Sequence, residues 1–237
     1  MILLGISGQL NSGKDSVAGR FADNLEIVHI ALADPMKQFG EQVFGFTDDQ
    51  LWGPSHLRNG CDERYFKDSS QWILAHDNLK FFSPSFIEKV CGEIDDQYLF
   101  SLFDWFENLQ LNNPNLSPRI MLQTLGTEWG RDCVNEDVWV NYMIRRAANI
   151  VERGIAGVVV SDVRFKNELE AIRKAGGKLV KVVRPVTDQN ALETGVKNHQ
   201  SESEQKFFDN DQFNFIILND SSLEDLYDKV DKISEYI

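Results

Sequence analysis

The fold is decided by residues 8–14, Gly-Gln-Leu-Asn-Ser-Gly-Lys, which directly follow the apolar run Ile2–Ile6. Glycines let backbone N–H groups converge on an anion, and a helix that begins near Gly13 adds the positive end of its dipole. Lys14 supplies a positive charge for the β- and γ-phosphates of a nucleotide. A buried strand that turns in this way into a helix predicts a phosphate-binding loop, with an ordinary glycine-rich strand–helix turn as the alternative.

The residue after this lysine departs from the usual pattern of such a loop. Asp15 stands where the pattern has a serine or threonine that binds Mg²⁺, and the hydroxyl follows one position later, at Ser16. Successive helical residues point about 100° apart, so Ser16 does not simply replace that hydroxyl. We expect Asp15 to hold the metal directly or through a water molecule. The expected ATP-binding residues are Asn11, Ser12, Gly13, Lys14, Asp15 and Ser16.

Length and charge limit the class of protein. The 237 residues suffice for one α/β domain with an insertion, or for two small domains. A net charge of −13 argues against a nucleic-acid-binding protein, although basic residues gathered in one cleft would still bind anionic substrates. Three cysteines without CxxC spacing indicate reduced, buried thiols in a cytoplasmic protein. We expect no signal peptide, because the chain does not open with a basic segment followed by a signal-type apolar stretch, and no membrane span, because no apolar run is long enough.

Four further apolar runs predict the other strands of a parallel sheet flanked by helices. They are residues 27–32, 155–160, 178–183 and 213–218. Asp34 and Pro35 predict the N-cap and the first position of a helix. Lys37 in the first turn of that helix opposes the helix dipole, which a bound anion would explain. A solvated surface lysine is an equal alternative.

Two segments interrupt this alternation of strands and helices. Residues 46–116 alternate turn signals with aromatic, acidic stretches, which predicts an inserted, mostly helical cap over the substrate side. Residues 184–208 are too long for a tight connection and too polar for a core, which predicts a lid-like loop. We expect the whole chain, 1–237, to form one domain that carries both segments.

A helix that opens at Ser117-Pro118 has two different faces. One face is a polar stripe at i, i+4 spacing, made of Arg119, Gln123 and Thr127. The opposite face is apolar and is expected to pack on the core, with Met121, Leu122, Leu125 and Trp129. Gly126 lies beside the polar stripe, where the absence of a side chain lets a group approach the backbone. We favour a ligand-facing stripe over a plain surface, which would more commonly carry Glu and Lys.

A second acidic position follows the apolar run 155–160. Asp162 lies at the carboxyl end of this predicted strand, where a P-loop protein has an acid that organises the metal. The N-cap of the next helix is the alternative role. Arg164 at the same edge suits bidentate phosphate binding, and Glu168, four residues further, would orient it or form an internal salt bridge with it.

Four stretches together resemble the bacteriophage deoxynucleoside monophosphate kinases. They are residues 8–16, 34–37, 117–128 and 161–168, and the last two are the most specific. The resemblance covers most of the chain but excludes most of the insertion, and the Gly-Lys-Asp form of the loop also occurs in that family. Ile120 departs from the basic residue that some members place after the arginine. Lys37 would have to supply that phosphate contact instead.

This resemblance implies a nucleoside-monophosphate-kinase-like fold that transfers the γ-phosphoryl group of ATP to a dNMP. The residues that it implies on the monophosphate side are Arg119, Gln123, Gly126, Thr127, Trp139, Asp162, Arg164 and Glu168, to which Lys37 is added as above. Trp139 is an equal candidate for packing against the sugar or base and for a place in the protein core.

We therefore expect an α/β fold of the P-loop NTPase type, with a five-stranded parallel sheet, a helical cap and a lid. The expected catalytic residues are Lys14, Arg119, Asp162 and Arg164, and the expected Mg²⁺-organising residues are Asp15, Ser16 and Asp162. The expected partners are small nucleotides, without nucleic acid or membrane, in the cytoplasm of a host cell if a phage encodes the chain. The sequence leaves open whether the chain forms a homodimer. The alternatives are a dephospho-coenzyme A or phosphomevalonate type of kinase, or a nucleotide-binding regulator without turnover.

Overall fold

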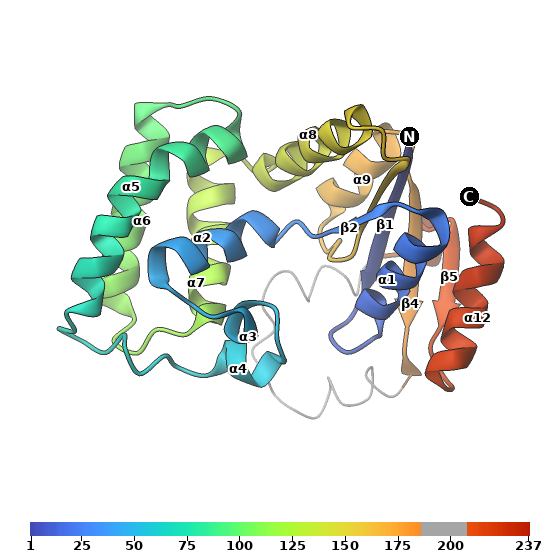
Figure 1. Ribbon diagram of the computed structural model, residues 1–237, viewed down its shortest axis with the longest axis horizontal. Helices are drawn as coiled ribbons and strands as arrows, with labels where there is room; N and C mark the ends of the chain where they lie inside the picture. The colour runs from blue at the N-terminus through green and yellow to red at the C-terminus, as the bar shows by residue number, and fades with distance from the viewer. Residues whose placement is uncertain (186–207) are drawn as a thin grey trace. The chain divides into compact units, whose positions relative to one another are not determined.

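The computed structural model describes residues 1–185 and 208–237 and divides the chain into two compact units (Figure 1). The sheet unit consists of Met1–Leu32 and Met143–Ile237, and the helical unit of Ala33–Tyr142. The segment 46–116 that we expected to be an insertion lies inside the helical unit. The expected lid, residues 184–208, lies outside the described residues except at its two ends.

The sheet has five parallel strands, as the sequence predicts. They are β1 (Ile2–Gly8), β2 (Val28–Ile30), β3 (Gly157–Val160), β4 (Lys178–Val183) and β5 (Phe215–Leu218), in the order β2-β3-β1-β4-β5. The β4 bounds match the prediction, whereas β2, β3 and β5 are shorter than their apolar runs. Because all strands are parallel, their carboxyl ends meet at one edge of the sheet, and ligands of open α/β folds bind there.

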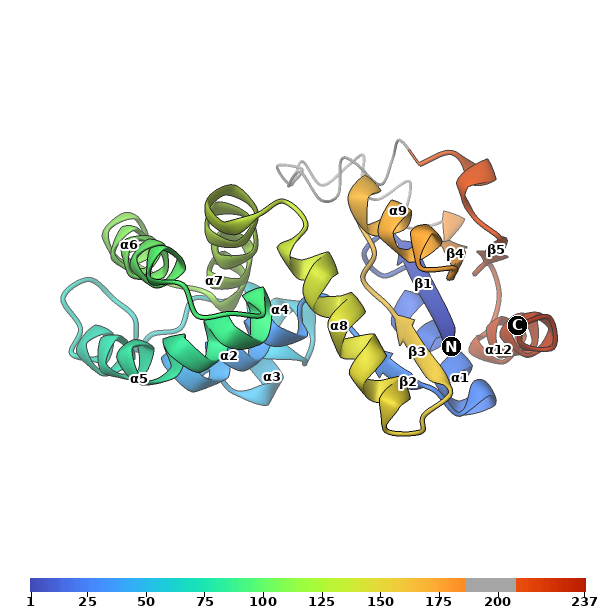
Figure 2. The same cartoon turned by 90° about the horizontal axis from the view of Figure 1, so that it is seen from above.

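Helices cover both faces of this sheet (Figure 2). Helices α1 (Lys14–Leu25) and α12 (Leu223–Ser234) pack on one face, where Leu4 and Ile6 of β1 meet Phe21 and Val230 in a buried apolar cluster. Helix α9 (Lys166–Lys174) packs on the other face. There, a Cβ added at Gly5 would lie 2.6 Å from Cδ1 of Ile172, so only glycine lets α9 approach this closely. The border between the two units falls within α8 (Val138–Glu152).

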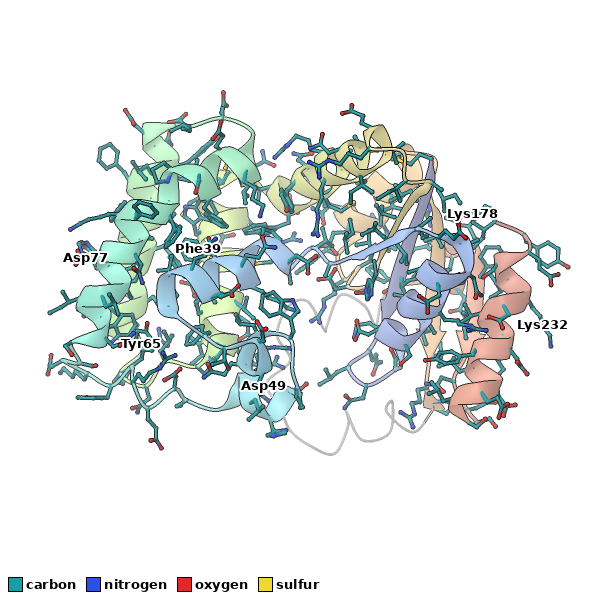
Figure 3. All side chains as sticks on the ribbon, in the orientation of Figure 1. Phe39, Asp49, Tyr65, Asp77, Lys178 and Lys232 are labelled. Carbon is teal, nitrogen blue, oxygen red and sulfur yellow. The ribbon has the colours of Figure 1, made fainter. Side chains whose placement is uncertain are left out.

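The remaining helices belong to the helical unit. They are α2 (Asp34–Phe44), α3 (Asp48–Leu51), α4 (Ser55–Asn59), α5 (Gln71–Cys91), α6 (Asp96–Asn112), α7 (Pro118–Thr124) and the π-helix η1 (Leu125–Val134). Their core is aromatic: Phe39 lies 4.5 Å from Phe86, and Tyr65 lies 5.0 Å from Trp72, between ring centroids. Figure 3 labels Phe39 and Tyr65. The aromatics of the predicted insertion therefore form much of this core.

The helix that begins after Ser117 differs in its second half from the prediction. Ser117 caps it as expected, since its side chain accepts a hydrogen bond from the N–H of Ile120. From Leu125 onward, however, the α-helix gives way to the π-helix η1. Met121, Leu125 and Trp129 are fully buried, as predicted, whereas Leu122 is only half-buried. The i, i+4 periodicity assumed a regular α-helix, so it did not detect the wider turns.

Two local predictions are wrong. Helix α2 begins at Asp34 with Ala33 as its N-cap, so Asp34 and Pro35 each lie one position further into the helix than predicted. The three cysteines are free, but Cys61 and Cys133 are exposed and Cys91 is half-buried. Cysteine composition indicates the redox state but not the burial of each thiol.

Among residues 1–185 and 208–237, no helix combines the length and the apolar character that crossing a membrane requires.

Candidate active site

The phosphate-binding loop connects β1 to α1 and has the backbone geometry that its glycines predict. Gly13 is left-handed, with φ 92°, and Asn11 is left-handed with φ 62°. The N–H of Ser12 donates to the carbonyl of Gln9 at 3.1 Å, which closes a tight turn. Ser12 is 1% exposed, and its Oγ has no hydrogen-bond partner among the described residues. A buried hydroxyl without a partner is costly in a protein, and a bound ligand can satisfy it.

Lys14 is the first residue of α1 and is buried, with 7% of its surface exposed. Burial lowers the pKa of Lys14, and Asp15 opposes this effect. Nζ of Lys14 lies 3.7 Å from Oδ2 of Asp15, whose side chain is largely exposed. Arg164 lowers the pKa of Lys14 further, while Asp162 raises it. Lys14, Asp15, Asp162 and Arg164 therefore form one electrostatic cluster around the phosphate-binding loop.

Asp162 follows β3 and lies at the carboxyl edge of the sheet. Its Oδ1 accepts a hydrogen bond of 2.7 Å from the backbone N–H of Leu32, just after β2. This contact fixes the carboxylate between the ends of two neighbouring strands. Asp162 thus lies where the sequence predicts a second acid, on the same sheet edge as the phosphate-binding loop.

Glu168 orients Arg164 through the backbone. Its Oε2 accepts hydrogen bonds from the N–H of Arg164, at 2.6 Å, and from the N–H of Phe165, at 3.0 Å. Glu168 is 3% exposed and lies in the first turn of α9, so it serves as the acidic partner at the helix start. The sequence predicted a pairing between Glu168 and Arg164, and the structure places it at the peptide group of Arg164.

We expect the replacement of Glu168 by alanine to destabilise the sheet unit. The substitution leaves two part-buried amides without their acceptor, at a cost of up to about 1–3 kcal/mol for each. Urea unfolding measures this loss. The matched control is Glu170→Ala on the same helix, because the half-buried Glu170 faces the exposed Lys166 at 3.9 Å and its removal should change stability by less than about 0.5 kcal/mol. Equal losses in the two variants would contradict the assigned role of Glu168.

Two side chains that the sequence did not reveal also hold the phosphate-binding loop. Asn219, directly after β5, donates from Nδ2 to the carbonyl of Ser12 at 2.8 Å. Arg184, directly after β4, donates from Nη1 to the carbonyl of Asn11 at 3.3 Å. Both residues lie more than 160 positions from the loop, so only strand order brings them to it. Their positions at the ends of predicted strands were the one signal available.

The basic residues predicted on the monophosphate side that belong to the helical unit lie near α3 and α4. Nζ of Lys37 lies 5.6 Å from the centre of the Trp52 ring, at the end of α3. Arg119 on α7 donates from Nε to Oδ1 of Asn59 on α4. The sequence did not single out Trp52 or Asn59. Trp52 is 42% exposed, which leaves part of its ring open to a planar group.

Trp139 and Gly126 contact each other inside the helical unit. Nε1 of Trp139 donates to the carbonyl of Gly126 at 2.8 Å, and Trp139 is 3% exposed. A Cβ at Gly126 would lie 3.0 Å from Sδ of Met36, and a Cβ at Gly130 would lie 2.4 Å from the Trp139 ring. The groups that approach these glycines are thus Met36 and Trp139. For Trp139 the geometry favours a place in the core, and contacts of Trp139 or Gly126 with a nucleotide stay predictions.

The predicted site residues therefore fall into two sets. The sheet unit brings together Asn11, Ser12, Gly13, Lys14, Asp15, Ser16, Asp162, Arg164 and Glu168. The helical unit holds Lys37, Arg119, Gln123, Gly126, Thr127 and Trp139, of which Gln123 and Thr127 are half-buried. Cooperation of Arg119 with Arg164 on one substrate stays a prediction.

Known proteins resemble this chain over most of its length. A family model described as deoxynucleotide monophosphate kinase matches residues 70–230. A protein of Acanthamoeba polyphaga mimivirus is 24% identical over 233 residues, which cover 97% of this chain and 94% of that protein. The deoxynucleoside-5′-monophosphate kinase of Escherichia phage T5 is 27% identical over 198 residues, 73% of this chain and 72% of the relative. Among solved structures, dephospho-CoA kinase from Campylobacter jejuni aligns with a TM-score of 0.44 and 11% identity, over 99% of this chain and 96% of that one.

Proposed function

The chain belongs to the deoxynucleotide monophosphate kinase family, and we propose that it transfers the γ-phosphoryl group of ATP to a deoxynucleoside monophosphate, which yields a deoxynucleoside diphosphate and ADP. One observation carries this proposal: Lys14 is buried directly after the left-handed Gly13, and it interacts electrostatically with Arg164 and Asp162. Phosphoryl transfer needs such positioned charges more than covalent chemistry.

The phosphate-binding loop holds the donor nucleotide in this proposal. The first backbone N–H groups of α1 have no partner within the helix and point at an anion bound beyond its start. Lys14 neutralises the β- and γ-phosphates, and the buried Oγ of Ser12 is available as a further donor. The donor site that we propose therefore consists of residues 11–16.

Arginines hold the acceptor phosphate in this proposal. Arg164 presents its guanidinium from the β3–α9 turn, which Glu168 holds in place through two backbone amides. Arg119 and Lys37 contribute positive charge from the helical unit. Gln123, Gly126, Thr127 and Trp139 complete the predicted set. The attacking phosphate oxygen is already anionic near neutral pH, because the second pKa of a phosphate monoester is about 6. No side chain has to remove a proton from it.

The residues around the loop suit Mg²⁺ bound together with the nucleotide. Within the described part of the chain, no group of three or more His, Cys, Asp or Glu residues can hold a metal ion by itself. Magnesium commonly uses one or two carboxylates, substrate phosphates and waters. Asp15, Ser16 and Asp162 supply oxygen donors of this kind. When bound, the ion would neutralise charge on the transferred phosphoryl group.

We also propose that free nucleotides, rather than nucleic acids, are the substrates. The net charge of −13 would repel an extended polyanion, whereas the cluster of Lys14 and Arg164 is local. The compartment that we propose is the cytoplasm, which is that of a host cell if a phage encodes the chain. A homodimer is the assembly to be tested. Sedimentation analysis with and without ATP tests the assembly.

The function is tested by measuring ADP release from ATP with each common dNMP and NMP in turn. We expect turnover with at least one deoxynucleoside monophosphate and none without an acceptor. Dephospho-coenzyme A and phosphomevalonate belong in the same panel. Turnover with one of these alone would replace the proposed acceptor, and ATP binding without ADP formation for any acceptor would indicate a regulator.

A further inference from the structure

Asn219 contacts the phosphate-binding loop from the far end of the chain. It lies at the carboxyl end of β5, 207 positions from Ser12 in the sequence, and donates from Nδ2 to the Ser12 carbonyl at 2.8 Å. Its own backbone is fixed, because its N–H donates to the carbonyl of Val183 at 2.7 Å. A Cβ at Gly13 would lie 2.6 Å from Nδ2 of Asn219, so the amide sits directly against the loop backbone.

The hydrogen bond to Ser12 also determines where the next amide points. The carbonyl and the N–H of a trans peptide point in opposite directions. With the Ser12 carbonyl turned toward Asn219, the N–H of Gly13 therefore points away from Asn219. Gly13 is the N-cap of α1, and its left-handed conformation, φ 92°, is one that the loop must maintain. The asparagine thus holds the peptide group at the very start of the anion-binding helix.

We propose that Asn219 is a positioning residue that keeps the phosphate-binding loop in its anion-binding conformation. Asn219 acts on ATP through the Ser12–Gly13 peptide and touches neither substrate. The Arg184 bond to the Asn11 carbonyl supports the same loop one residue earlier. The inference rests on the proposed function only in taking ATP as the anion that the loop binds.

The chain offers a matched control in Asn214, at the other end of β5. Oδ1 of Asn214 accepts a hydrogen bond from the N–H of Leu179, also at 2.8 Å. Each asparagine therefore makes a hydrogen bond of 2.8 Å between its side-chain amide and the backbone, Asn219 as donor and Asn214 as acceptor. They differ in position, because Asn214 lies at the amino edge of the sheet, away from the loop. Loss of a structural hydrogen bond alone would affect both variants alike.

The experiment compares Asn219→Ala, Asn219→Asp and Asn214→Ala with the wild type. Calorimetry gives the Kd for ATP and for adenosine, and steady-state kinetics give KM for each substrate; thermal unfolding gives Tm. We expect Asn219→Ala to raise the Kd for ATP about 5- to 10-fold, as loss of one hydrogen bond would. Adenosine affinity and the KM for the monophosphate should stay within about 2-fold, since neither depends on the loop amides.

Asn219→Asp gives a sharper test, because the aspartate side chain has nearly the same shape as the asparagine side chain that it replaces. A carboxylate cannot donate to the Ser12 carbonyl and adds negative charge beside the phosphate site, so ATP affinity should fall further than in Asn219→Ala. Asn214→Ala should lower Tm and leave the Kd for ATP unchanged. Equal ATP affinity in the wild type and both Asn219 variants would overturn the proposal. Because ATP binding is measured without an acceptor, this result is independent of which monophosphate the enzyme phosphorylates.

Discussion

Replacement of Lys14 by alanine is expected to lower kcat by about 10³-fold or more, to near-complete loss of phosphoryl transfer. In GTPases, an arginine that stabilises transition-state charge contributes about 10³–10⁵-fold to kcat. Lys14 is buried, and burial lowers its pKa, so its charge is held in a place that is unfavourable without an anion. Such an arrangement is typical of a functional lysine rather than a stabilising one.

The same burial predicts how the stability of this variant changes. Because the desolvated charge of Lys14 does not stabilise the free protein, Lys14→Ala should fold and retain its Tm within a few degrees. Lys178→Ala is the matched control, since Nζ of Lys178 donates to the Tyr236 carbonyl at 2.7 Å, at the opposite edge of the sheet. That variant should keep kcat within about 2-fold. A kcat near the wild-type value in Lys14→Ala would refute the assignment of the phosphate-binding loop.

Replacement of Arg164 by alanine should give the second largest effect. We expect a higher KM for the monophosphate or a lower kcat, by about 10²–10³-fold in kcat/KM, because the guanidinium that we propose to bind the acceptor phosphate is lost. ATP affinity should change much less, since Lys14 and the loop amides stay in place. Steady-state kinetics with each substrate varied in turn separate the two effects.

The control for Arg164 lies on the helix that follows it. Arg173, in the last turn of α9, donates to the Gln212 carbonyl and is remote from the β3–α9 turn. Arg173→Ala should leave both KM values unchanged. If Arg164 is purely structural, Arg164→Ala will instead lose stability in urea while its kinetic constants stay intact. Arg164 also lowers the pKa of Lys14, so its removal should raise that pKa.

Much of the proposed donor site could be derived from the sequence, because the strand, loop and helix that form it are adjacent in the chain. The strand Ile2–Gly8, the left-handed Gly13 and the buried Lys14 are all contained in a single strand–loop–helix segment. The N-cap at Ser117 and the bounds of β4 were also predictable from neighbouring residues alone. Asp162 and Arg164 were found from their position at the end of an apolar run, since parallel strands bring their carboxyl ends to one edge.

Other features were hidden because they depend on contacts between distant segments. The exposure of Cys61 and Cys133 follows from how the helical unit packs, and residue type does not report it. The π-helix η1 replaces a predicted regular helix where the Trp139 indole bonds to the Gly126 carbonyl. A hydrophobic periodicity of 3.6 residues contains no information on such a contact.

The sequence by itself thus determined the phosphate-binding loop, the five parallel strands and the acids and arginines that follow them, because backbone preferences and strand ends act over a few residues. Only the tertiary structure decided that Asn219 and Arg184 hold this loop, that Glu168 binds the amides of the Arg164 turn, and that Trp139 packs against η1. The physical reason is that these hydrogen bonds require two groups within about 3 Å, and strand order and helix packing set that distance.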